Sequence, residues 1–197
     1  MKNFVETPQA VVMGASTGGL NALQTILNAV PGNFPGVFLV VQHRKAAAED
    51  LLSYLLRQVC PLPVVEAKDK IQIYPGHVYI APADYHLLVE QDKHLSLSVD
   101  AHVSYARPSI DVLFETAAEA YKKYLIAVLL TGANHDGTAG MSKIKFCGVL
   151  TIAQDPATAE ASTMPAIDGG WVDHILPLAE IADFIVNHFK HGFQCDD

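Results

Sequence analysis

Three polar side chains lie in the segments that follow three apolar runs. Ser16 follows residues 10–13, His43 follows residues 37–41, and Asp136 lies in the loop after residues 124–130. A serine, a histidine and an aspartate supply the nucleophile, the general base and the group that orients the base in acyl-transfer hydrolysis. We therefore predict a Ser16–His43–Asp136 triad, provided that the fold brings the three segments together.

The serine lies in a glycine-rich turn that fits G-x-S-x-G, with Gly14, Ser16 and Gly18. Small neighbours allow a serine to project from a sharp strand-to-helix turn, and the amides at the helix start can bind an oxyanion. A phosphate or dinucleotide loop is the alternative. No lysine follows the glycines as in a Walker A loop, and the spacing differs from G-x-G-x-x-G. The order serine, histidine, aspartate also differs from that of α/β-hydrolases.

The histidine and the aspartate also have structural interpretations. His43 at a strand end can simply bond the backbone, and Asp136 can cap the helix that follows it. His135 is a rival base beside Asp136, but two neighbours on a glycine-flanked loop do not easily face each other, so we expect His135 to point outward. Each residue alone fits a structural role as well as a catalytic one. The placement of all three at one edge of the sheet favours a catalytic site.

The elements that must position these residues follow from the apolar pattern. The apolar residues come in continuous runs, which is typical of strands buried on both faces of a parallel sheet. The runs are residues 10–13, 37–41, 124–130, 149–152 and 172–176. Helical spacing separates them at residues 17–30, 46–59, 109–124, 137–146 and 178–189. This alternation predicts an α/β fold: a three-layer α/β/α, doubly wound, mostly parallel sheet, whose strand ends meet at one edge.

One stretch departs from this alternation. Residues 78–80, 85–89 and 95–99 resemble short strands separated by polar residues, which predicts an antiparallel hairpin at one edge of the sheet. We assign residues 1–190 to a single domain and residues 191–197 to a short tail.

Composition excludes several classes of protein. The 197 residues are 50% hydrophobic, and 13 basic against 21 acidic residues give a formal charge of -8, which disfavours nucleic-acid binding. No signal peptide or membrane-length apolar run is visible, so we expect a cytoplasmic protein without membrane insertion. Three cysteines lack a C-x-x-C pair, and His188 and His191 lack a third ligand, so no metal and no cofactor are expected.

Six blocks of the sequence together resemble the catalytic domain of the CheB family of chemotaxis protein-glutamate methylesterases. In order from about residue 11 to 178 they are VVMGASTGGLNAL, VFLVVQH, PGHVYIAPADYHLLV, ARPSIDVLFETAA, VLLTGANHDGTAGM and LTIAQDPATAEASTMP. The family's catalytic serine, histidine and aspartate fall on Ser16, His43 and Asp136. The resemblance thus implies the same three residues that the strand ends indicate.

The resemblance implies hydrolysis of glutamyl methyl esters on methylated chemoreceptors, with glutamine deamidation as a second activity. Backbone amides near Thr17, Gly132 and Ala133 are the candidate oxyanion donors. Two alternatives stay open: a catalytically silent signalling module that binds a receptor or a methyltransferase, and a small-molecule esterase. A deep apolar pocket would favour the esterase.

The chain departs from the family pattern at several points. Ala133-Asn134 stands where the family usually has Met-Gly, and Ala106 where it has histidine, so pocket shape or rate is expected to differ. Arg107 remains as a substrate-edge candidate, or as a loop anchor paired with Asp111. The first predicted strand begins at about residue 10, so we expect no N-terminal receiver domain. We therefore expect either a constitutively open site or control by a separate regulatory protein.

Overall fold

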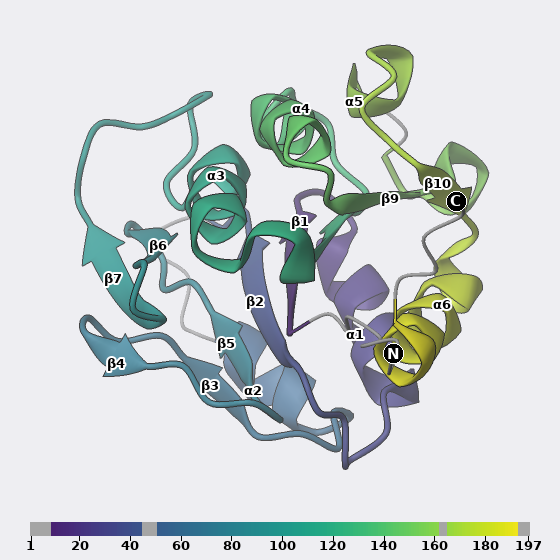
Figure 1. Ribbon diagram of the computed structural model, residues 1–197. Helices are drawn as coiled ribbons and strands as arrows, with labels where there is room; N and C mark the ends of the chain where they lie inside the picture. The colour runs from purple at the N-terminus through teal and green to yellow at the C-terminus, as the bar shows by residue number, and fades with distance from the viewer. Residues whose placement is uncertain (1–8, 45–50, 162–164, 193–197) are drawn as a thin grey trace, which may run out of the picture.

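The protein, described by a computed structural model over residues 9–44, 51–161 and 165–192, is built on a seven-stranded sheet (Figure 1). The strand order is β10-β9-β8-β1-β2-β5-β3, and every neighbouring pair is parallel. The strands are β1 Ala10–Ala15, β2 Val37–Gln42, β3 Val64–Glu66, β5 Val78–Ile80, β8 Leu125–Leu129, β9 Leu150–Gln154 and β10 His174–Leu176. The predicted fold class is confirmed.

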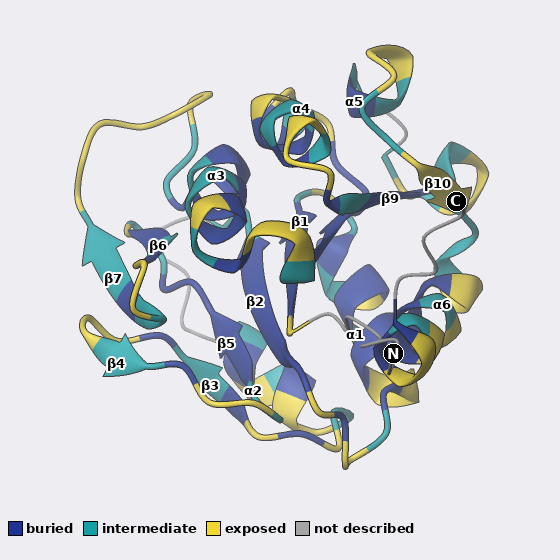
Figure 2. Ribbon diagram, in the orientation of Figure 1, coloured by how far each residue is buried: buried dark blue, intermediate teal, exposed yellow. Residues whose placement is uncertain are grey.

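Helices cover both faces of this sheet. On one face lie α1 Gly19–Ala29, α2 Leu51–Arg57 and α6 Leu178–His191; on the other lie α3 Ile110–Tyr121 and α4 Thr138–Phe146. The shorter helices are η1 Lys122–Tyr124, η2 Pro156–Thr158 and α5 Pro165–Asp168. Strand β1 packs against both layers: Val11 and Met13 belong to the core under α1 and α6, and Ala10 and Val12 to the core under α3 and α4. The central strands are accordingly buried throughout (Figure 2).

The antiparallel strands form a sheet of their own. β4 Ile71–Gln72, β7 His94–Ser98 and β6 His86–Val89 pair in that order, and β6–β7 is the expected hairpin. The prediction was wrong in placing residues 78–80 with this hairpin, because β5 pairs in parallel with both β2 and β3. A short apolar run does not reveal which strand it pairs with, so this assignment needed the tertiary structure.

The carboxyl ends of β8, β1 and β2 lie side by side at the centre of the sheet. The chain leaves β1 through α1 to reach β2 and returns through α3 to β8, so the winding direction changes at β1, where a ligand crevice is expected. Gly14, near the end of β1, permits a close approach of α3, since a Cβ atom there would lie 2.3 Å from Ile110 Cγ2. The start of α3 thereby reaches the end of β1.

Most predicted helices agree with the structure to within a few residues, and α6 extends two residues beyond its predicted end. Part of one prediction, residues 46–50, lies outside the described residues, as do Met164 of the ASTMP block and tail residues 193–197. Within the described part of the chain, no helix is long and apolar enough to cross a membrane. The same ranges contain no cluster of three or more histidine, cysteine or acidic side chains suited to a metal ion.

Candidate active site

Ser16 lies in the turn between β1 and α1, and backbone contacts from both neighbouring strand ends fix it. Its N–H donates to the Thr131 carbonyl oxygen at 2.9 Å, and its own carbonyl oxygen accepts from Gln42 Nε2 at 2.7 Å. Gly18, at φ 79°, lies in the left-handed region that glycine adopts without strain, which lets the chain turn sharply into α1. The side chain of Ser16 is thus held at the carboxyl edge of the sheet.

The structure brings Ser16, His43 and Asp136 together in one hydrogen-bonded chain. His43 Nδ1 lies 3.2 Å from Ser16 Oγ, and His43 Nε2 lies 2.6 Å from Asp136 Oδ2. A carboxylate accepts hydrogen bonds only, so Nε2 carries the proton that it donates to Asp136 and Nδ1 keeps a free lone pair toward the serine. The arrangement can take a proton from Ser16 and stabilise the resulting imidazolium.

Asp136 is fully buried and accepts four hydrogen bonds. Besides His43, the donors are the Ile110 N–H at 2.7 Å, the Ser109 hydroxyl at 2.7 Å and the Asp111 N–H at 3.1 Å, all at the start of α3. Burial opposes ionisation, but these bonds outweigh it and hold the pKa of the Asp136 carboxyl below its ordinary value. The alternative that Asp136 caps the following helix is wrong: Gly137 is the N-cap of α4.

Asp111 is a second buried carboxyl beside Asp136. Burial, together with the charge of Asp136, raises its pKa to about 6. Asp111 Oδ1 accepts from the Gly137 N–H at 2.9 Å and the Gly140 N–H at 2.7 Å, at the start of α4. The expected pair between Arg107 and Asp111 is therefore wrong, because the carboxyl turns inward to α4.

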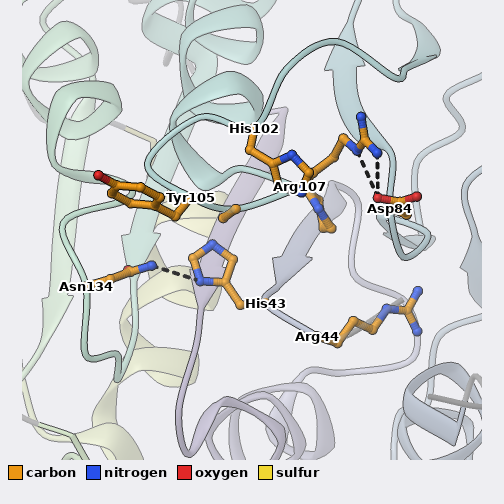
Figure 3. Close-up of a pocket in the computed structure, with 9 residues that line it drawn as sticks. His43, Arg44, Asp84, His102, Tyr105, Arg107 and Asn134 are labelled. Carbon is orange, nitrogen blue, oxygen red and sulfur yellow. Dashed lines mark hydrogen bonds and ion pairs between the residues drawn. The ribbon is translucent and has the colours of Figure 1, made fainter. Parts of the chain in front are cut away.

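Arg107 instead pairs with Asp84, through Nη2 at 2.7 Å and Nε at 3.0 Å (Figure 3). Its Nη1 atom donates to the carbonyl oxygens of Val99 and Asp100 at 2.7 and 3.0 Å. The guanidinium thus ties the loop between β7 and α3 to the loop before β6. It also lines the cavity beside His43, so a place at the substrate edge stays a prediction.

A cavity of about 430 Å³ opens in front of the His43 ring (Figure 3). Its lining is mostly polar: His43, Arg44, Asp84, His102, Tyr105, Ala106, Arg107, Pro108 and Asn134. The side chain of Asn134 points at the histidine, with Nδ2 at 3.4 Å from Nδ1. Ala106 also lines this cavity, with only a methyl group as its side chain. His135 is exposed, which agrees with the expectation that it points outward.

The three candidate oxyanion donors differ in their backbone contacts. Thr17 and Ala133 are exposed, and neither N–H has an acceptor within residues 9–44, 51–161 and 165–192. The Gly132 N–H donates to the Ala161 carbonyl oxygen at 3.3 Å, so that group is already engaged. Thr17 and Ala133 therefore remain the available backbone donors among the three.

The residues that support the three side chains carry no signal of this role in the sequence pattern. The Ser109 hydroxyl donates to Asp136 Oδ1, and Nδ1 of the buried His86 accepts the Ser109 N–H at 3.2 Å. Gln42 and Asn134 contact the backbone of Ser16 and the ring of His43, respectively. The sequence predicts a helix that starts at Ser109, after Pro108. No local pattern indicates that the Ser109 hydroxyl bonds Asp136, 27 residues away.

Comparison with known proteins gives consistent matches. A profile of the CheB methylesterase family matches residues 11–185. A relative from Leptospira interrogans is 46% identical over 94% of this chain and 97% of its own length. The protein-glutamate methylesterase/protein-glutamine glutaminase of Thermotoga maritima is 39% identical over 89% of this chain and 53% of its own length. The crystal structure of the Thermotoga maritima CheB methylesterase catalytic domain superposes with a TM-score of 0.87, at 38% identity, over 92% of this chain and 98% of that one.

Proposed function

Because the chain belongs to the CheB methylesterase family, we propose that it is a protein-glutamate methylesterase that acts on a methylated chemoreceptor through Ser16, His43 and Asp136. One observation carries the assignment of residues: the hydrogen-bonded chain from Ser16 Oγ through the imidazole to the buried Asp136 carboxylate. These contacts support the roles of nucleophile, general base and orienting carboxylate that we propose for Ser16, His43 and Asp136.

In the first half of the reaction, Ser16 Oγ attacks the carbonyl carbon of the γ-glutamyl methyl ester. His43 Nδ1 takes the hydroxyl proton as the new bond forms, and the π-electron pair moves to the carbonyl oxygen. When the tetrahedral intermediate collapses, the same proton passes to the departing methoxide, and methanol leaves. Asp136 keeps the proton on Nε2 and stabilises the charged ring during both steps.

In the second half, a water molecule gives its proton to His43 Nδ1 and attacks the acyl-serine. Glutamate is released and Ser16 recovers its proton. General base catalysis of this kind contributes about 10²- to 10⁴-fold in rate. A glutamine side chain presents the same carbonyl group with ammonia as the leaving group, so we include protein-glutamine deamidation as a second activity.

The cavity favours a protein glutamyl ester over an apolar small ester. A deep hydrophobic pocket would suit a small-molecule esterase, whereas this cavity is lined by two arginines, two histidines, an aspartate and an asparagine. The aligned Ser16, His43 and Asp136 argue against a silent signalling module, since such a module has no need of a positioned base.

Methanol release from membranes that carry a methyl-labelled chemoreceptor tests the proposal. We expect release by the wild-type protein and none above background by Ser16→Ala. Equal release by both proteins would rule out Ser16 as nucleophile. No release by the wild type on the receptor, together with turnover of aryl acetates that Ser16→Ala lacks, would favour the small-molecule esterase.

A further inference from the structure

Asn134 has a place in the proposed esterase reaction, on which its role rests. Asn134 lies in the loop between β8 and α4 and lines two cavities. One is the large cavity in front of His43, and the other is a small hollow of about 10 Å³ that Ser16 and Gly132 also line. Asn134 therefore borders both the cavity open to a substrate and the hollow beside the nucleophile.

Asn134 and Ser16 approach the same atom of the base. Asn134 Nδ2 lies 3.4 Å and Ser16 Oγ 3.2 Å from His43 Nδ1. Nδ1 offers one lone pair, because Nε2 carries the ring proton toward Asp136. Both donors share that single acceptor in the free protein, and Asn134 forms the longer contact.

Proton transfer removes this acceptor from Asn134. When Ser16 Oγ bonds to the ester carbon, its proton goes to Nδ1, which becomes a donor and no longer attracts an N–H group. In the same step the carbonyl oxygen takes up a negative charge and needs donors of its own. The amide of Asn134 thus loses its partner at the moment when a new acceptor forms beside Ser16.

Backbone donors for that oxygen are few. The Gly132 N–H is engaged with the Ala161 carbonyl oxygen, which leaves Thr17 and Ala133 as the backbone candidates. We propose that Asn134 is a catalytic residue, whose Nδ2–H donates to the ester carbonyl oxygen as it becomes an oxyanion. This contact forms only in the transition state, so it accelerates the chemical step without tightening substrate binding.

The test compares Asn134→Ala and Asn134→Leu, an uncharged side chain of similar size without a donor, with the wild type, on the full chain and the methyl-labelled receptor membranes. His135→Ala is the matched control, because His135 is the exposed neighbour in the same loop. We expect kcat at the pH optimum to fall about 100-fold in both Asn134 variants, with KM within about threefold of the wild type. His135→Ala should keep kcat within about twofold.

The direction of the change separates an oxyanion donor from a group that only competes with Ser16 for His43. Removal of a mere competitor would leave kcat unchanged or raise it, and either result would overturn the proposal. A matching fall in His135→Ala would assign the effect to the loop and overturn it as well. Thermal unfolding of each variant identifies those that fold, and Asn134→Leu serves if Asn134→Ala does not. If the wild type itself releases no methanol, the proposed function fails, and this inference with it.

Discussion

Asp136, which lies just before α4, accepts amides at the start of α3, and Asp111, which lies in the first turn of α3, accepts amides at the start of α4. The amides that Asp136 accepts include that of Asp111 itself, and those that Asp111 Oδ1 accepts belong to Gly137 and Gly140. A helix N-terminus stabilises negative charge, so each helix start helps to hold a carboxyl group of the other segment. These bonds lock the loop that carries Asp136 against α3, and they fix the carboxylate that faces His43.

Replacement of Asp136 by asparagine tests this fixed carboxylate. The amide would keep the size of the side chain but would allow the other tautomer of His43, with the proton on Nδ1 facing Ser16. We expect kcat to fall by about 10³- to 10⁴-fold, measured as methanol release under substrate saturation. Asp84→Asn, at the far side of the cavity, is the control for loss of a negative charge. A loss of less than about tenfold in Asp136→Asn would assign the orienting role to another group.

Asp111→Asn should change how stability depends on pH. The pKa of Asp111 is raised from 3.8 to about 6, so the folded protein holds a proton that the unfolded chain releases. Stability therefore falls as pH rises from about 4 to about 6. The lowered pKa of Asp136 acts below this window, where it makes stability rise with pH. Asparagine still accepts the Gly137 and Gly140 amides but does not titrate.

Urea unfolding of the wild type and Asp111→Asn at half-unit steps from pH 4 to 7 measures this effect. The free-energy difference between the two proteins should shift in favour of the variant as pH rises, and then level off above about pH 6. If the free energies of unfolding of the two proteins change with pH in parallel from pH 4 to 7, Asp111 does not titrate in that range.

Ser109→Ala should weaken both the helix start and the site. Its hydroxyl donates to Asp136 at 2.7 Å and accepts from the Val112 N–H at 3.4 Å as the N-cap of α3. Loss of the cap is expected to lower the free energy of unfolding by about 1 kcal/mol. Loss of the bond to Asp136 should lower kcat by about tenfold. Ser109→Thr keeps the hydroxyl, so we expect its free energy of unfolding and its kcat to be close to those of the wild type. If kcat stays low in Ser109→Thr, the loss of kcat in Ser109→Ala is assigned to packing and not to the hydroxyl.

Arg107→Lys should loosen the loop between β7 and α3. Lysine cannot reproduce the two-pronged contact with Asp84 together with the bonds to the Val99 and Asp100 carbonyl oxygens. We expect faster proteolytic cleavage in this loop and a several-fold rise in KM, with kcat within about twofold. Asp84→Asn should show the same pattern more weakly. A large fall in kcat at unchanged KM would instead place Arg107 at the reacting group.

The sequence by itself determined where the polar residues lie along the chain and which edge of the sheet they share. Continuous apolar runs predict buried parallel strands, and such strands present their carboxyl ends together, so Ser16 and His43 could be placed at one edge. The helix start at Ser109 was likewise local information, carried by a capping residue after proline.

Only the tertiary structure decided which groups meet. In the folded protein, Nδ1 of His43 faces Ser16, and Asp136 accepts hydrogen bonds from α3 instead of α4. Arg107 pairs with Asp84, and Asn134 contacts the imidazole of His43. Each of these contacts joins segments far apart in the sequence, and its geometry depends on how helices and loops pack over the sheet. Periodicity records which side of an element is buried but not the partner that a buried polar group finds there.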